Sequence, residues 1–78
     1  MIAKEMTQTK IETAQAFALK LEEYDIESQW EYTFQAKGRL ERLDRSLCRL
    51  YEAGCVSLKD FKRLDAMILN RMVKLNLN

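Results

Sequence analysis

Three arginines are the residues of this chain best placed to do chemistry together. Arg42, Arg45 and Arg49 are spaced by three and four residues, so on a helix they project from the same side. Guanidinium groups gathered in this way bind phosphate oxygens and release the counterions of a nucleic acid. The alternative is a solvated face with internal ion pairs, because Glu41 with Arg45, and Glu52 with Arg49, have the spacing of such pairs.

The charge of the chain is divided unevenly along its length. Residues 1–36 hold three lysines and seven acidic residues, whereas residues 37–78 hold ten basic and five acidic residues, and the net charge is only +1. An acidic first helix can therefore face basic later helices, within one chain or between chains, and this complementarity would fix the order of packing.

Trp30 and Phe34 form a second group of candidate binding residues. Trp30 and Tyr32 lie at opposite margins of the apolar arc expected for the middle helix, and Phe34 lies beyond that arc. Trp and Tyr are typical anchors of protein interfaces, and large apolar residues outside a core stripe need a cover. That cover is either the first helix of the same chain or a partner.

The inventory of catalytic and metal-binding residues is nearly empty. The chain has no His, which removes the commonest general base and a common metal ligand. Cys48 and Cys55 cannot make a four-ligand zinc site alone, and on a helix they lie too far apart for a disulfide. No glycine-rich phosphate loop is present. We therefore expect a non-enzymatic protein with no catalytic, metal-binding or cofactor-binding residues, and no cofactor.

The elements that position these residues are predicted to be three helices. Two glycines and no proline favour a few long helices over a sheet. Apolar stripes place the helices at about residues 10–25, 29–53 and 58–75. Three capping boxes are expected at their starts, namely Thr9 with Glu12, Ser28 with Glu31, and Ser57 with Asp60. The alternative is one continuous helix over residues 10–53, in a two-helix hairpin that dimerises into a four-helix bundle.

The best-specified boundary is the second turn. Gly54 suits the left-handed residue that ends a helix, and Val56 with Phe61 has the spacing of a hydrophobic staple. The short connection predicts antiparallel helices. In the last helix Asp65 falls inside the apolar stripe, so an arginine or lysine partner from another helix or another chain is expected for it.

The length of the predicted middle helix bears on the shape of the molecule. A helix over residues 29–53 is about 37 Å long, whereas a compact chain of this size is about 30 Å across. Either the helix bends at Gly38, or the molecule is elongated and is stabilised by packing against a second chain. We therefore expect a homo-oligomer such as a dimer.

These features predict an all-α protein, either a small three-helix bundle or a long helical hairpin, completed by oligomerisation. Residues 1–8 are expected to be a flexible N-terminus, and residues 9–78 a single helical domain. No apolar run is long enough to span a bilayer, and the N-terminus lacks the apolar core of a signal peptide. We therefore expect no membrane partner and a cytoplasmic location.

The function predicted from these properties is that of a small protein-interaction module. A helical face would dock on a larger macromolecule, with a protein as the first expected partner, and the chain would act as a regulator, adaptor or inhibitor. Accessory proteins of phages and plasmids offer an analogy at this size. The rival function is nucleic-acid binding. The candidate partner-binding residues are Trp30, Phe34, Arg42, Arg45 and Arg49.

Overall fold

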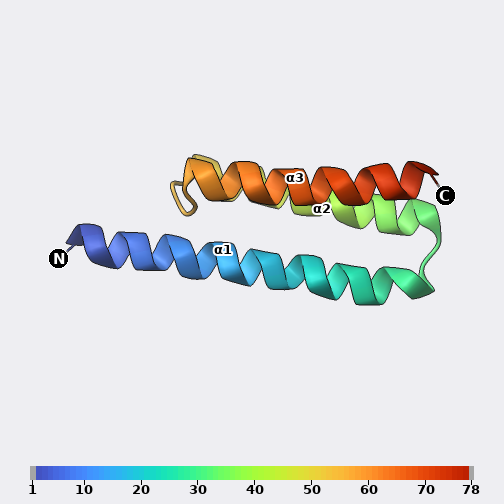
Figure 1. The fold of residues 1–78 in the computed structure, drawn as a ribbon, viewed down its shortest axis with the longest axis horizontal. Helices are drawn as coiled ribbons and strands as arrows, with labels where there is room; N and C mark the ends of the chain where they lie inside the picture. The colour runs from blue at the N-terminus through green and yellow to red at the C-terminus, as the bar shows by residue number, and fades with distance from the viewer. Residues whose placement is uncertain (1, 78) are drawn as a thin grey trace.

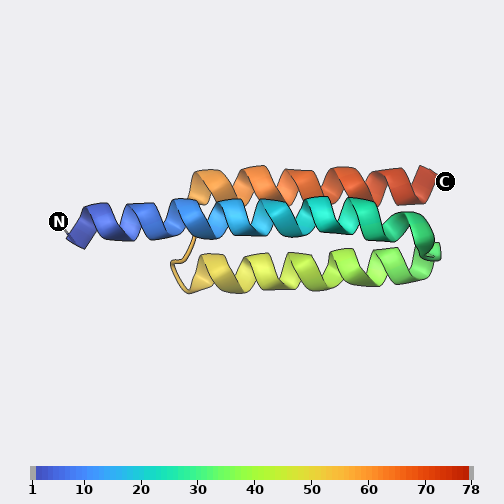
Figure 2. The ribbon, with the colours of Figure 1, turned by 90° about the horizontal axis from the view of Figure 1, so that it is seen from below.

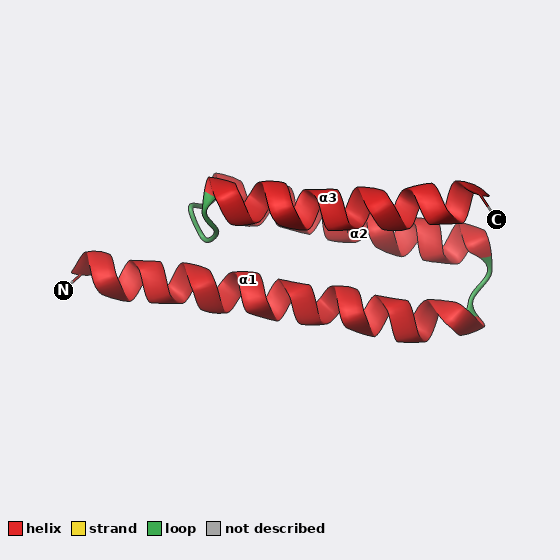
Figure 3. Ribbon diagram, in the orientation of Figure 1, coloured by secondary structure: helices red, strands yellow, loops and turns green. Residues whose placement is uncertain are grey.

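The computed structural model describes the backbone of residues 2–77 and the side chains of residues 8–76. Its α-helices are α1 (Ile2–Glu27), α2 (Thr33–Glu52) and α3 (Leu58–Leu77), and a short 3₁₀ turn, η1 (Ser28–Trp30), follows α1. Over residues 2–77 the fold is all-α, without strands (Figure 3). The helices form an elongated bundle of 48 × 18 × 15 Å, in which α1 runs antiparallel to α2 and parallel to α3 (Figures 1 and 2).

The core is made by one apolar ridge from each helix. On α1 the ridge residues recur every three or four positions and are at most 4% exposed, and they are Ala14, Phe17, Leu21 and Tyr24. The facing residues from α2, the second turn and α3 are equally buried, and they are Ala36, Leu40, Leu47, Val56, Leu64 and Ile68. None of the buried side chains in the described part of the chain is polar or charged. The helical periodicity of the sequence is therefore confirmed, and the core closes within one chain.

The bundle is elongated, and α2 continues through Gly38 without interruption. A helix of 20 residues is about 30 Å long, so α2 lies along the 48 Å bundle without having to bend. The shape therefore gives no separate reason for a second chain, and the oligomer stays a prediction. Within the described residues, no helix combines the length and the hydrophobicity needed to cross a membrane.

The first turn differs from the prediction. The chain reverses between α1 and α2, so the continuous helix over residues 10–53 is wrong (Figure 1). The middle helix starts at Thr33 and not near residue 29. The backbone N–H of Tyr32 donates a hydrogen bond to Oε1 of Gln35 at 3.0 Å, which satisfies a donor at this end of the helix.

The capping box predicted for Ser28 and Glu31 is not formed, because both side chains bind elsewhere. The Ser28 hydroxyl donates to the backbone carbonyl oxygen of Asp25 at 3.5 Å. The Glu31 carboxylate accepts a hydrogen bond from Nη1 of Arg39 at 2.7 Å. A charge-assisted bond of this kind is about twice as strong as a neutral one, so it outcompetes the local cap.

The start of α1 also lies earlier than predicted. The backbone is helical from Ile2, so Thr9 lies inside α1 and is not its N-cap. The Thr13 hydroxyl donates to the carbonyl oxygen of Thr9 at 2.8 Å, which is a bond of the helix interior. The first turns of α1 project beyond the α2–α3 turn (Figures 1 and 2). Met1 lies outside the described residues, and the flexibility expected of residues 1–8 stays a prediction.

The end of α2 is built as predicted. Gly54 has a φ of +75°, the left-handed conformation that glycine adopts without a steric cost. Its N–H donates to the carbonyl oxygen of Tyr51 at 3.0 Å, and the N–H of Cys55 donates to that of Leu50 at 2.8 Å. These two bonds are the pair that defines a Schellman motif.

The start of α3 is confirmed as well. The backbone N–H of Asp60 donates to the Ser57 hydroxyl oxygen at 3.1 Å, so Ser57 is the N-cap. Val56 is buried in the core and Phe61 packs against the same cluster, which places both residues of the staple on the apolar side. The second turn therefore follows from its local sequence.

Within the described residues, the arginine or lysine partner predicted for Asp65 is not found on another helix, and a partner on another chain stays a prediction. Among the described residues no arginine or lysine forms an ion pair with Asp65, and its neighbour across the α2–α3 seam is a second carboxyl group, Asp44. Both residues are only half-buried, so water lowers the cost of the missing cation. Burial raises the pKa of Asp44, and so do the hydrogen bond to Asp65 and the negative charge there.

The two glycines allow a matched test of the second turn. Gly54→Ala is expected to lower the free energy of unfolding by about 1–2 kcal/mol, because the new Cβ atom is strained at a positive φ. Gly38→Ala is the control. Its Cβ atom would meet only Nη1 of Arg42 at 3.8 Å, so it should raise the free energy of unfolding by about 0.5–1 kcal/mol. Urea denaturation measures both, and equal effects would contradict the assigned turn.

The carboxyl pair predicts an unusual dependence of stability on pH. Because the pKa of Asp44 is raised in the folded state, its stabilising contribution is present at acidic pH and is lost as the pH rises through the folded pKa. At neutral pH the ionised Asp44 repels Asp65. Asp44→Asn should therefore raise the neutral-pH stability by about 0.5 kcal/mol, which is about 2–4 °C in Tm.

Thermal melts at pH 7 and near pH 4 check this prediction, and the gain should shrink at the lower pH. Asp60→Asn is the control with the opposite sign at pH 7, because Asp60 lies in the first turn of α3 and pairs with Arg63 at 3.3 Å. A neutral-pH Tm that falls in Asp44→Asn would show that the carboxylate is satisfied rather than repelled.

Candidate functional site

Three large aromatic side chains gather on the connection between α1 and α2. We call Trp30, Tyr32 and Phe34 the aromatic patch, and their exposed fractions are 86%, 75% and 74%. The rings of Tyr32 and Phe34 are nearly parallel, with an interplanar angle of 8° and 6.1 Å between centroids. Trp30 and Phe34 were predicted to need a cover, and α1 does not provide one.

The backbone of the connection explains why these side chains point outward. Trp30 ends η1, and Glu31 then takes an extended conformation with φ −111° and ψ 155°. Tyr32 is extended too, and α2 starts immediately after it. Phe34 is already part of α2 and precedes the buried Ala36 by two residues, which places these two side chains on opposite faces of the helix.

Ion pairs on both sides of the connection hold it in place. The guanidinium of Arg39 on α2 binds Glu31 in the connection and Glu27 at the end of α1. These two carboxylates raise the pKa of Arg39, so its charge is permanent. On α3 the guanidinium of Arg71 binds Asp25 through two parallel bonds of 2.8 and 2.7 Å. The connection is therefore tied to α2 through Glu31, and the end of α1 that precedes it is tied to both α2 and α3.

The other predicted site residues lie along the outer side of α2. We call Arg42, Arg45 and Arg49 the arginine row, and all three are exposed. Together with Ser46 they line a shallow depression of about 320 Å³. Neither of the expected pairs, Glu41 with Arg45 or Glu52 with Arg49, is formed in the described structure.

The arginine row differs in this respect from the other arginines of the chain. Arg39, Arg63 and Arg71 each bind a carboxylate, whereas no ion pair of the described residues includes a member of the row. Three guanidinium groups are therefore available to an external anion. Phe34 lies on the same side of α2, because residues 34, 38, 42, 45 and 49 are spaced by one turn each. Phe34 therefore lies in line with the arginine row, and Trp30 comes four residues before Phe34 in the sequence.

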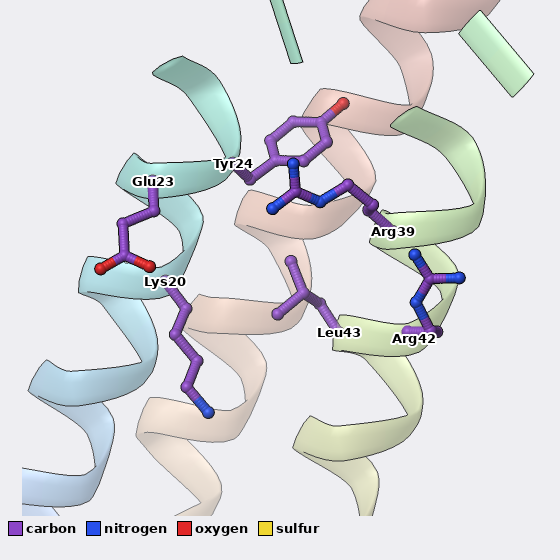
Figure 4. A pocket seen from close by; sticks show the side chains of 6 residues that line it. All are labelled: Lys20, Glu23, Tyr24, Arg39, Arg42 and Leu43. Carbon is purple, nitrogen blue, oxygen red and sulfur yellow. The ribbon is translucent and has the colours of Figure 1, made fainter. Parts of the chain in front are cut away.

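A groove between α1 and α2 borders the arginine row. It has a volume of about 310 Å³, with Lys20, Glu23 and Tyr24 on α1 and Arg39, Arg42 and Leu43 on α2 (Figure 4). Burial raises the pKa of the Tyr24 hydroxyl, whereas a hydrogen bond to Ser28 lowers it. Three basic groups and one carboxylate line the groove, and Arg39 is already paired with Glu27 and Glu31.

The Cys48 thiol lies among carboxylates and is half-buried. Burial raises the pKa of the Cys48 thiol, and the charges of Asp44, Asp65 and Glu52 raise it further, which keeps the sulfur protonated at neutral pH. Among the side chains of residues 8–76, no group of three or more Cys, Asp and Glu could hold a metal ion.

Comparison of the chain with protein-family models, curated proteins and solved structures gives no match. Its candidate site is therefore interpreted from its own geometry.

Sequence reasoning missed two parts of this site. Tyr32 belongs to the aromatic patch because the connection is extended. The sequence would have predicted this only if the helix had not been expected to begin after Ser28. The carboxylates that hold the connection, Glu27 and Glu31, pair with Arg39 at separations of twelve and eight residues. No helical spacing rule covers such distances.

The exposure of Trp30 predicts that its indole contributes little to folding. Trp30→Ala should change the free energy of unfolding by no more than about 0.5 kcal/mol. Phe17→Ala, which empties a buried position, should cost about 3–5 kcal/mol. Urea denaturation followed by far-ultraviolet circular dichroism measures both variants. A loss of more than about 1 kcal/mol in Trp30→Ala would mean that the indole is covered.

Proposed function

We propose that this chain is a non-enzymatic docking module whose aromatic patch binds a protein partner. The observation that carries the proposal is the exposure of three aromatic side chains beside a closed core. Single apolar residues on a surface need no explanation, but three large exposed aromatic side chains within residues 30–34, two of them stacked, mark an interaction site. Aromatic residues are also the side chains that dominate the energy of protein interfaces.

The position of the patch supports this proposal. The ion pair between Arg39 and Glu31 holds the connection on α2, and Arg39 and Arg71 hold the end of α1 beside it, so less conformational entropy is lost on binding. Rings of Trp and Tyr add a large contact area with few rotatable bonds. Regulation, adaptation and inhibition are all roles that such a module can fill.

The test is capture of partners from an extract of the source cell, with three forms of the full chain as bait. These are the wild type, the variant Trp30→Ala/Tyr32→Ala/Phe34→Ala, and the control Leu69→Ala/Val73→Ala, which removes two exposed apolar side chains from α3. A docking partner should bind the wild type and the control and be lost with the aromatic variant. The purified partner should then change the fluorescence of Trp30, the only tryptophan.

Two results would contradict the proposal. One is a set of captured proteins that is the same for all three baits. The other is a partner that binds the aromatic variant with an affinity within threefold of the wild type, because hot-spot truncations cost 2 kcal/mol or more, about thirtyfold in Kd. Circular dichroism of each bait establishes that it is folded.

A further inference from the structure

We propose that the side of the bundle formed by α1 and α2 is an interface for a second copy of this chain. In this dimer the arginine row of each copy binds the acidic outer face of α1 of the other copy. The proposed interface is centred on the arginine row and does not depend on the docking function.

The first observation is that the exposed charges without ion pairs differ in balance between the two helices. On α2 the arginine row and Lys37 outnumber Glu41 and Glu52. On α1 the carboxylates of Glu12, Glu22 and Glu23 outnumber Lys20, and none of these groups forms an ion pair in the described structure. The carboxylates that do form ion pairs, Asp25, Glu27, Glu31 and Asp60, are already bound by the other three arginines.

The second observation is that exposed apolar side chains accompany the acidic residues. Leu19 and Ile26 are each more than half exposed, and with Glu22 and Glu23 they occupy positions 19, 22, 23 and 26 on one face of α1. Two branched apolar residues with carboxylates between them form the pattern of a helix face that packs against another surface. Burial of these two side chains would supply an apolar contribution that ion pairs alone lack.

The symmetry of the bundle brings the two faces together. Glu23 on α1 and Arg42 on α2 line the same groove, so they lie at the same height along the bundle (Figure 4). A two-fold axis parallel to the helices preserves height and stacks α1 of one copy on α2 of the other. Glu23 of each copy then lies level with Arg42 of its partner.

The other two arginines of the row extend from Arg42 in the same direction as Glu12 extends from Glu23. Arg49 lies about 10 Å from Arg42 along α2, and because α1 and α2 are antiparallel this direction leads toward Glu12. Each contact is made twice in such a dimer. The bundle is 48 Å long and 18 Å wide, so one long side offers an area comparable to the ~800 Å² per partner of a standard interface.

A nucleic acid fits this side of the bundle less well. A polyanion on the arginine row would approach Glu23, which lines the same groove as Arg42, and salt screens their repulsion only beyond a Debye length of about 8–10 Å. Glu41 and Glu52 flank the row on α2, and the net charge of the chain is only +1. A second copy presents both signs of charge in the complementary order, so it satisfies the acidic and the basic residues together.

Sedimentation of charge-reversed variants of the full chain tests the proposal. Variant one carries Arg42→Glu/Arg45→Glu/Arg49→Glu, and variant two carries Glu12→Lys/Glu22→Lys/Glu23→Lys. Wild type should dimerise at low ionic strength and lose at least tenfold in affinity at about 0.5 M salt. Each variant alone should dimerise at least tenfold more weakly than wild type. The equimolar mixture should recover a heterodimer, because each reversed face then meets its complement.

The mixture also serves as the folding control, since recovery requires both variants to be folded. The proposal is overturned by a wild type that stays monomeric up to about 1 mM, by dimers that tolerate both reversals, or by folded variants that fail to associate when mixed. It is also overturned if monomeric wild type binds single-stranded or duplex DNA through the arginine row. The variant Trp30→Ala/Tyr32→Ala, which keeps Phe34 beside the arginine row, should dimerise like wild type, which separates this result from that of the docking test.

Discussion

The structure depends on the fit of a single apolar ridge of α1 between α2 and α3. Ala14, Phe17, Leu21 and Tyr24 are the buried residues of this ridge, and each is at most 4% exposed. Burial of one large apolar side chain stabilises a fold by about 1.5–3 kcal/mol, so a few such residues account for most of the attachment of α1. Because the ridge is narrow, the opposite side of α1 and the outer side of α2 remain in water. The surfaces available for binding are thus a direct consequence of the core.

The two turns show what the sequence could and could not predict about the fold. At the second turn, Gly54 and Ser57 act on backbone groups within a few residues, so the pattern predicts its own geometry. At the first turn, Ser28 and Glu31 have the spacing of a cap, but Arg39 takes the Glu31 carboxylate. A local pattern is a weak predictor where a distant charge competes for the same group. Helix α2 therefore begins at Thr33 and not near residue 29, and the connection before it is extended.

The candidate site was predictable to a similar degree. The common direction of Arg42, Arg45 and Arg49 follows from helical spacing, as does the position of Phe34 outside the core stripe. The ion pair of Arg45 with Glu41 that the spacing suggested is not formed. An exposed pair at this spacing is worth only about 0.3–0.5 kcal/mol, and hydration and side-chain entropy oppose it. The contact between Asp44 and Asp65 joins two helices, so it required the packed structure.

The ion pairs that do form are concentrated at one end of the bundle, and this asymmetry organises the surface. Arg39 and Arg71 tie the end of α1 to α2 and to α3 beside the aromatic patch. At the other end α1 is held by apolar contacts from residues such as Ala14 and Phe17, and its first turns project past the α2–α3 turn (Figure 1). Exposed ion pairs add little stability singly, but two parallel bonds fix an orientation. The end that carries the exposed aromatic rings is therefore the end whose geometry is most completely determined, which is the arrangement that preorganised binding requires.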